Sequence, residues 1–132
     1  MLFKKENILP DNELYRRLPR GNYNSRRERF SSSAFKLRKK EKSLAAISVN
    51  WDRHSTPENS SICPRTKQQY DVGAIKACIP IREGLEVVHK PSNNMFYPNQ
   101  AHSLIRGKRL VDSELEITEI FAKNCRAAWI PK

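Results

Sequence analysis

Two histidines, His89 and His102, are the residues whose type and spacing most directly suggest chemistry. His89 ends the strand-like segment 85–90, and His102 lies in the next strand-like segment, beyond a loop rich in Asn and Pro. If the two segments are neighbouring strands, the imidazoles can converge at the loop end of a sheet. Histidines titrate near neutral pH, so such a pair can move a proton from a ribose 2′-hydroxyl to a leaving 5′-oxygen. This predicts a metal-independent ribonuclease, with Lys90 or Arg106 stabilising the developing charge.

The same histidines also allow other interpretations. His89 shares a face with Leu85 and Val87, which is typical of a histidine packed inside a sheet. A metal site would have to draw its ligands from His54, His89, His102, Asp52 and Glu58. Nothing in their spacing enforces a metal site, so the prediction includes no metal and no cofactor.

Basic residues are concentrated in the first third of the chain. Residues 1–43 contain 13 Lys and Arg against 5 Asp and Glu, whereas the remainder contains 12 against 9. Guanidinium groups suit phosphates, and the interleaved aromatic residues can stack on unpaired bases. The predicted phosphate contacts are Arg16, Arg17, Arg26, Arg27, Arg29, Lys36, Arg38, Lys39 and Lys40. We therefore expect a small accessory protein that binds nucleic acid, RNA above all, or a nucleic-acid-processing complex. An acidic protein partner and a generic basic surface are the alternatives.

Other motifs are absent from the sequence, which narrows the functional classes. It contains no GxSxG, P-loop or GxGxxG motif, and no CxxC that would indicate a zinc ribbon. Three widely spaced cysteines argue against a disulfide framework and for a reducing compartment. No apolar run approaches the roughly 20 residues that span a bilayer. We expect a cytoplasmic bacterial protein without a membrane partner.

These residues must be positioned by secondary-structure elements, and the order of strand-like and helix-like segments predicts an α+β fold. We expect a small, mostly antiparallel sheet, a short middle helix and a C-terminal helix. We expect one domain over 1–132, with a basic portion at 1–43 and a compact core at 44–132. In the basic portion, 11–18 reads as a short helix and 31–38 as a strand. The stretch "SSSAF" would then be an ordered strand framed by basic runs.

The core segments have sharper patterns. Period-two apolar positions predict a strand at 44–51, and Ser55 with Glu58 predicts a short helix that Pro64 limits. A β-hairpin is expected from 72–81 and 85–90, followed by a loop and a strand at 101–105. Ser113 and Glu116 form a second capping box, and Ile117, Ile120, Phe121, Cys125 and Ala128 follow one helical face.

Two resemblances add to this interpretation. The string "LYRR…SSSAF…ISVNW…STPE…LEVVHK…NQAHSLI", over residues 14–105, resembles a group of small bacterial proteins; this implies that "SSSAF" belongs to the folded unit and implies no activity or site. The pair "LYRRL…SSSAF" resembles the NAD-binding Arg and the Ser-containing strand of ADP-ribosyltransferase folds. That family's third element is a Glu. Here Glu114, Glu116 and Glu119 lie on a predicted helix, which departs from the pattern.

Overall fold

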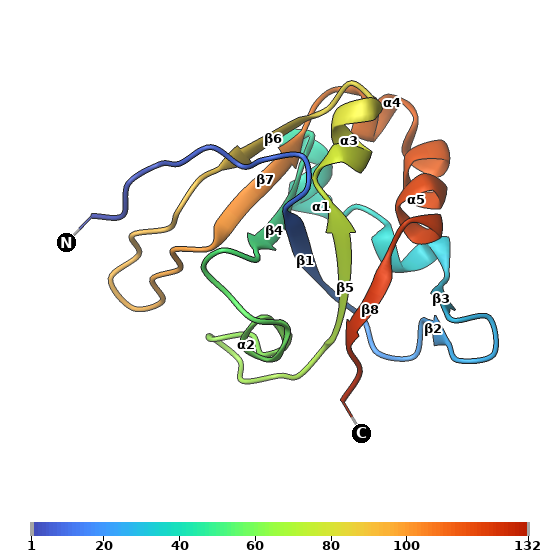
Figure 1. Cartoon of the computed structure of the whole chain (residues 1–132), viewed down its shortest axis with the longest axis horizontal. Coiled ribbons are helices and arrows are strands. Elements are labelled where there is room, and N and C mark those ends of the chain that lie inside the picture. The colour runs from blue at the N-terminus through green and yellow to red at the C-terminus, as the bar shows by residue number, and fades with distance from the viewer. Residues whose placement is uncertain (1, 132) are drawn as a thin grey trace.

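The computed structural model describes residues 2–131 and has an α+β fold centred on a six-stranded antiparallel sheet (Figure 1). The strands lie in the order β6-β7-β4-β1-β5-β8. Their bounds are β1 Glu13–Leu18, β4 Ala46–Trp51, β5 Asp71–Lys76, β6 Glu86–His89, β7 His102–Arg106 and β8 Arg126–Trp129. A separate two-stranded ribbon pairs β2 (Tyr23–Asn24) with β3 (Arg29–Phe30).

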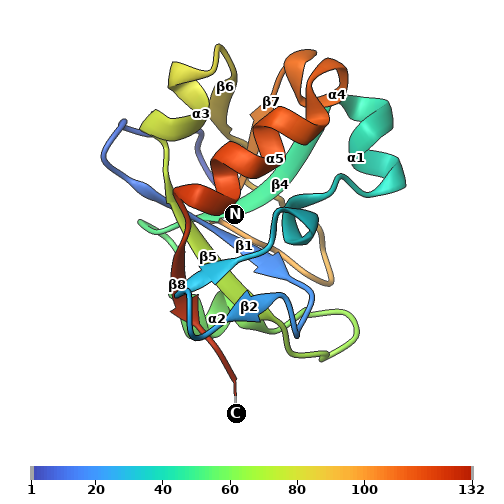
Figure 2. The same cartoon turned by 90° about the vertical axis from the view of Figure 1, so that its right-hand side faces the viewer.

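Short helices connect these strands and cover the sheet. Their bounds are η1 Ser32–Phe35 (a 3₁₀-helix), α1 Lys39–Leu44, α2 Pro57–Ser61, α3 Cys78–Arg82, α4 Arg109–Asp112 and α5 Glu114–Lys123. Figure 2 shows α5 in front of the sheet with η1 beside it, and α2 near the lower end of β5 and β8. Within the described part of the chain, no helix has the length and apolarity needed to cross a bilayer.

The main core lies between one face of the sheet and the layer formed by η1 and α5. Ile47 and Ile105 are buried on the sheet, and Ile117 and Phe121 are buried on α5. Phe35 of η1 is 1 % exposed and packs edge-on against Phe121, with ring centroids 6.0 Å apart. The stretch "SSSAF" therefore belongs to the folded unit, as expected, but it forms a 3₁₀ turn and the predicted strand there is wrong. Serine hydroxyls compete for backbone hydrogen bonds, which favours a turn over a strand.

The predicted helix over 11–18 is also wrong, because these residues form the central strand β1. Leu14 and Leu18 are spaced for one face of a helix, yet they also share one face of a strand. Arg16 lies between them on the same side and disguises the period-two pattern. Pairing with β5 along the whole strand overrides the weak local preference.

The predicted hairpin of 72–81 with 85–90 does not form. β5 ends at Lys76, and 78–82 turns into α3. β5 then pairs with β1 and β8, while β6 pairs with β7 on the opposite side of the sheet. The strands β4, β6 and β7 are confirmed where the alternation predicted them.

The other two predicted helices, the short middle helix and the C-terminal helix, exist with different ends. Thr56, and not Ser55, caps α2 by accepting a hydrogen bond from the Asn59 N–H at 3.1 Å. Helix α5 begins after Ser113 as expected, although the Ser113 side chain makes no capping bond. The chain leaves the helix after Lys123 and forms β8, so the helical spacing of Cys125 and Ala128 was coincidental.

Candidate functional site

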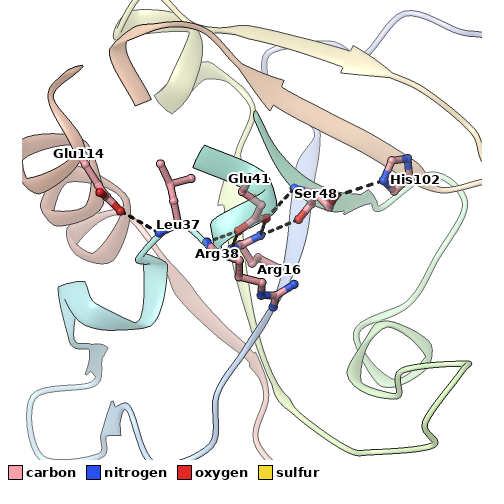
Figure 3. A network of polar contacts seen from close by, with 7 residues as sticks. All are labelled: Arg16, Leu37, Arg38, Glu41, Ser48, His102 and Glu114. Atoms are coloured by element: carbon pink, nitrogen blue, oxygen red, sulfur yellow. Dashed lines mark hydrogen bonds and ion pairs between the residues drawn. The ribbon is translucent and has the colours of Figure 1, made fainter. Parts of the chain in front are cut away.

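The candidate site begins where β1 and β4 separate. These strands pair only at Leu14↔Trp51 and Tyr15↔Asn50, although β1 pairs with β5 over its full length. Beyond that point a side-chain ion pair fills the gap. Arg16 donates from Nη1 and Nη2 to the two carboxylate oxygens of Glu41, at 2.8 and 2.9 Å (Figure 3).

This ion pair also replaces the missing backbone ladder at Ser48. The Ser48 carbonyl accepts from Arg16 Nη1 at 3.0 Å, and the Ser48 N–H donates to Glu41 Oε2 at 3.3 Å. Burial alone would raise the pKa of Glu41, but the Arg16 guanidinium and the backbone donors of Arg38 and Ser48 outweigh it, and the pKa is lowered. Glu41 is therefore a buried carboxylate that fixes β4 and the start of α1.

Arg16 is consequently not the phosphate contact that the sequence predicted. It is 3 % exposed, and both terminal nitrogens are committed to Glu41 and Ser48. A charge this deep needs a partner charge, because desolvating an unpaired ion costs several kcal/mol. The neighbouring Arg17 is half-buried on the other side of β1, and burial lowers its pKa.

A small pocket opens at this separation, and we call it the junction pocket. Its volume is about 40 Å³, which suits one phosphate or sugar group and not a whole nucleoside. The lining residues are Tyr15, Arg16, Arg17, Arg38, Ser48, Val49, Asn50, Asn99 and His102. This set contains several cationic and amide side chains and no carboxylate, so an anionic group is the ligand that it suits.

His102 and Ser48 both line the junction pocket, and Figure 3 shows their side chains directed toward each other. His102 Nδ1 lies 2.7 Å from the Lys90 carbonyl, which can only accept, so Nδ1 carries the hydrogen of the neutral ring. Nε2 therefore holds the lone pair, and it lies 3.4 Å from Ser48 Oγ. The arrangement is a base, oriented by a backbone carbonyl, beside a hydroxyl.

A second pocket adjoins the first, and we call it the loop pocket. It has a volume of about 250 Å³ and shares Arg17, Asn99 and His102 with the junction pocket. The rest of its lining comes from two loops: Cys63, Pro64, Arg65, Ser92 and Tyr97. It again contains no carboxylate, and Tyr97 offers an aromatic ring. The two pockets together have the size and chemistry for a nucleotide.

One cysteine in the loop pocket has an activated thiol. Hydrogen bonds from the Thr66 side chain and from the backbone of Thr66 and Arg65 lower the pKa of Cys63 to about 7. In contrast, burial raises the pKa of Cys125 to about 12. A thiolate at Cys63 adds a reactive group to an otherwise cationic wall.

The predicted pairing of His89 with His102 is not formed. The strands are neighbours, but His89 lies opposite Ser103, so adjacent His102 points to the other face of the sheet. His89 is 4 % exposed and both ring nitrogens are engaged: Nδ1 accepts from the Glu6 N–H at 3.0 Å, and Nε2 donates to the Gln100 carbonyl at 2.6 Å. A ribonuclease that needs both rings on one phosphodiester therefore has no geometric support.

We call residues 2–10 the N-terminal arm. His89 belongs to a cluster of aromatic rings beneath this arm. Its ring packs on Trp51 and stacks on His54 with centroids 5.0 and 5.6 Å away, and His54 pairs with Glu6. Among the described residues, no three His, Cys, Asp or Glu side chains are grouped as metal ligands would be.

The other predicted phosphate contacts are divided between two surfaces. Arg26 and Arg27 are exposed at the β2–β3 turn and Arg29 is half-buried, whereas the exposed Lys36, Arg38, Lys39 and Lys40 follow η1 into α1. Figure 2 shows the two segments apart, with the β2–β3 ribbon low in the view near β8 and α1 at the upper right. Of these residues, only Arg38 lines a pocket together with Arg17.

Several residues that line the two pockets carry no functional signal in the sequence, namely Ser48, Asn50, Asn99, Arg65 and Tyr97. Ser48 and Asn50 are the outward positions of a strand, where polar residues are ordinary. Asn99 and Tyr97 lie in a turn-rich loop, and Arg65 is one cation among many. Only the fold, which brings residues 17, 48 and 102 together, distinguishes them.

Comparisons of the chain with protein-family models, with curated proteins and with solved structures each gave no match.

Proposed function

We propose that the two pockets bind the nicotinamide-nucleotide half of a dinucleotide of the NAD class, and that the protein cleaves its nicotinamide–ribose bond, transferring the ADP-ribosyl group to water or to an acceptor. The observation that carries this proposal is that Arg17, Ser48 and His102, from three strands of the sheet, line one acid-free pocket. The chain resembles ADP-ribosyltransferase folds in an Arg on the "LYRR" segment. We assign to Ser48 on β4 the place first given to "SSSAF", which lies in η1, and to His102 the role that this family gives to its Glu.

The chemistry of the pocket suits this reaction. The bond from ribose C1′ to the pyridinium nitrogen breaks, and both electrons leave with nicotinamide, which departs neutral and needs no proton. An oxygen nucleophile forms the new bond to C1′, and its proton passes to His102 Nε2. Because the leaving group takes no proton, one oriented base and no general acid are sufficient for this cleavage. Arg17 and Arg38 would hold the diphosphate, since guanidinium groups bind phosphate oxygens bidentately.

The proposal is tested by measuring NAD⁺ binding by calorimetry and nicotinamide release by chromatography. Arg17→Ala should weaken binding by about 1.5–3 kcal/mol, the value of a charge-assisted hydrogen bond. His102→Ala should reduce release far more than binding, because the base acts on the transferred proton. Arg26→Ala, an exposed cation remote from both pockets, is the matched control and should change neither. Equal NAD⁺ binding by wild type and Arg17→Ala would remove the proposal.

A second candidate is nucleic-acid binding, with RNA favoured, through the two basic surfaces. One carries Arg26, Arg27 and Arg29 at β2–β3, and the other carries Lys36, Arg38, Lys39 and Lys40 from η1 into α1. None of these cations has an ion-pair partner among residues 2–131, so their charges are free for a polyanion. We place the protein in the cytoplasm, where such partners occur and where its three free cysteines stay reduced.

Reversing the charges of Arg26, Arg27 and Arg29 tests this second candidate. RNA affinity should fall, and the salt slope should flatten by roughly one unit per lost phosphate contact. Unchanged affinity and an unchanged salt slope would exclude the β2–β3 surface as the RNA-binding surface. If the wild-type protein does not bind RNA, and the charge-reversed variant loses binding to an acidic protein, the partner is an acidic protein.

A further inference from the structure

Strand β6 lies at one end of the sheet and presents unpaired backbone groups. It pairs on one side with β7, where the Lys90 N–H donates to the His102 carbonyl at 3.0 Å. In an antiparallel ladder the inward-facing backbone groups alternate, so the N–H and C=O of Val87 and His89 point away from β7. Among the described residues these four groups have no hydrogen-bond partner.

A cleft separates this edge from the N-terminal arm. Two backbone donors hold the arm beside the cleft: the Phe3 N–H donates to Asn93 Oδ1 at 2.8 Å, and the Glu6 N–H donates to His89 Nδ1. Farther along, the Pro10 carbonyl accepts from the Cys78 N–H at 2.9 Å. Within the described chain, residues 5–8 of the arm make no backbone hydrogen bond to β6. The cleft between them has a volume of about 460 Å³, so an extended segment fits where a covering strand would otherwise lie.

The charges around the cleft define the kind of segment. Lys5 and Lys90 are exposed at the cleft and have no ion-pair partner among residues 2–131. The Glu6 carboxylate is turned to His54 and Arg53 and is already neutralised there. Ile8 and Val87 supply apolar contacts between the cations. Alternating acidic and apolar side chains would match this wall.

We propose that an extended, acidic peptide segment of a partner protein adds to the sheet as a strand beside β6. The free N–H and C=O groups have the spacing of a strand, so their partner is a polypeptide main chain. In such an added strand, main-chain hydrogen bonds give the affinity and side-chain contacts give the specificity. Lys5 and Lys90 then contact its carboxylates. This surface is separate from the junction and loop pockets, and the inference does not depend on the proposed reaction.

The test uses an acetylated heptapeptide of alternating Glu and Val, with binding measured by calorimetry and amide exchange by NMR. We expect saturable binding that slows exchange of the Val87 and His89 amides. The same peptide N-methylated at alternate residues keeps every side chain but loses its donors, and it should not bind. A Lys/Val peptide tests the charge selection and should not bind either.

Two variants locate the charges. The double variant Lys5→Glu/Lys90→Glu should weaken binding of the acidic peptide by about tenfold or more. Lys108→Glu changes an exposed lysine on another part of the surface and should leave the affinity unchanged. Equal binding of the N-methylated peptide would overturn strand addition. Absence of binding at millimolar peptide, or amide protection confined to β8, would overturn the site.

Discussion

Two polar clusters in this molecule use similar residues with opposite results. At the strand junction, Arg16 and Glu41 fill a gap between β1 and β4, and His102 beside them directs one nitrogen to the exposed Ser48 hydroxyl at a pocket. At the sheet edge, His89 is sealed against Trp51 and has both nitrogens engaged. The comparison shows that the face of the strand on which a histidine lies decides which polar groups it meets, even when two histidines are on neighbouring strands.

The largest expected effect comes from breaking the buried pair at the junction. Glu41→Gln leaves Arg16 charged and without its counterion, and should lower the free energy of unfolding by about 3–5 kcal/mol in urea titrations. The double variant Arg16→Met/Glu41→Leu should recover only part of this loss. It removes the unpaired charge but also the partners of the Ser48 N–H and carbonyl, each costing about 1–3 kcal/mol. Full recovery would mean that the ladder replacement at Ser48 is unimportant.

The pH dependence of the same pair is the next effect. The folded-state pKa of Glu41 lies below its ordinary value of 4.5. The carboxylate therefore contributes stability that is complete above that value and is lost as pH falls through the lower folded pKa. The stability difference between wild type and Glu41→Gln should shrink as urea titrations move from pH 7 to pH 3. The control Glu119→Gln removes only a surface ion pair with Lys123 and should cost less than about 1 kcal/mol at pH 7.

A comparison of the two histidines should give intermediate effects. His89→Ala strands the Glu6 N–H and the Gln100 carbonyl, and should cost about 1–3 kcal/mol and speed exchange of the Glu6 amide. His102→Ala removes a half-exposed ring and should cost less than about 1 kcal/mol, while abolishing nicotinamide release. The reverse order of stability losses would contradict the roles assigned to the two clusters.

The smallest effect on stability is expected at Cys63, where the change is one of reactivity. With a pKa of about 7 against about 12, Cys63 should be alkylated by iodoacetamide at pH 7 well before Cys125, as followed by peptide mass spectrometry. NAD⁺ bound across both pockets should slow the modification of Cys63. An unchanged rate at saturating NAD⁺ would place the ligand outside the loop pocket.

Period-two alternation was sufficient to predict the α+β class and the strands β4, β6 and β7. It failed where a strand carries a buried charge, as Arg16 does in β1, and where helical spacing continues by chance beyond α5 into β8. Those elements are determined by pairing with distant strands, which a local pattern does not contain. The turn of "SSSAF" was misread because buried Ala34 and Phe35 fit either conformation.

The site was less accessible to prediction than the fold. His102 was identified as a candidate, but its partner was misassigned because a register offset of one residue reverses the face of a strand. Arg16 and Arg17 are identical in type and adjacent in sequence, yet one is consumed by Glu41 and the other lines both pockets. Such distinctions depend on which side of β1 each residue occupies.

The central position of β1 also shapes how the chain must fold. It is the earliest strand of the six-stranded sheet in chain order, and its two neighbours, β4 and β5, begin at residues 46 and 71. During synthesis β1 therefore emerges with both edges open and stays incompletely paired until more than fifty further residues have been added. Pairings of such high sequence separation slow folding and expose the nascent strand to association with other chains. The segment that forms the middle of the finished sheet is the one that most needs protection on the ribosome.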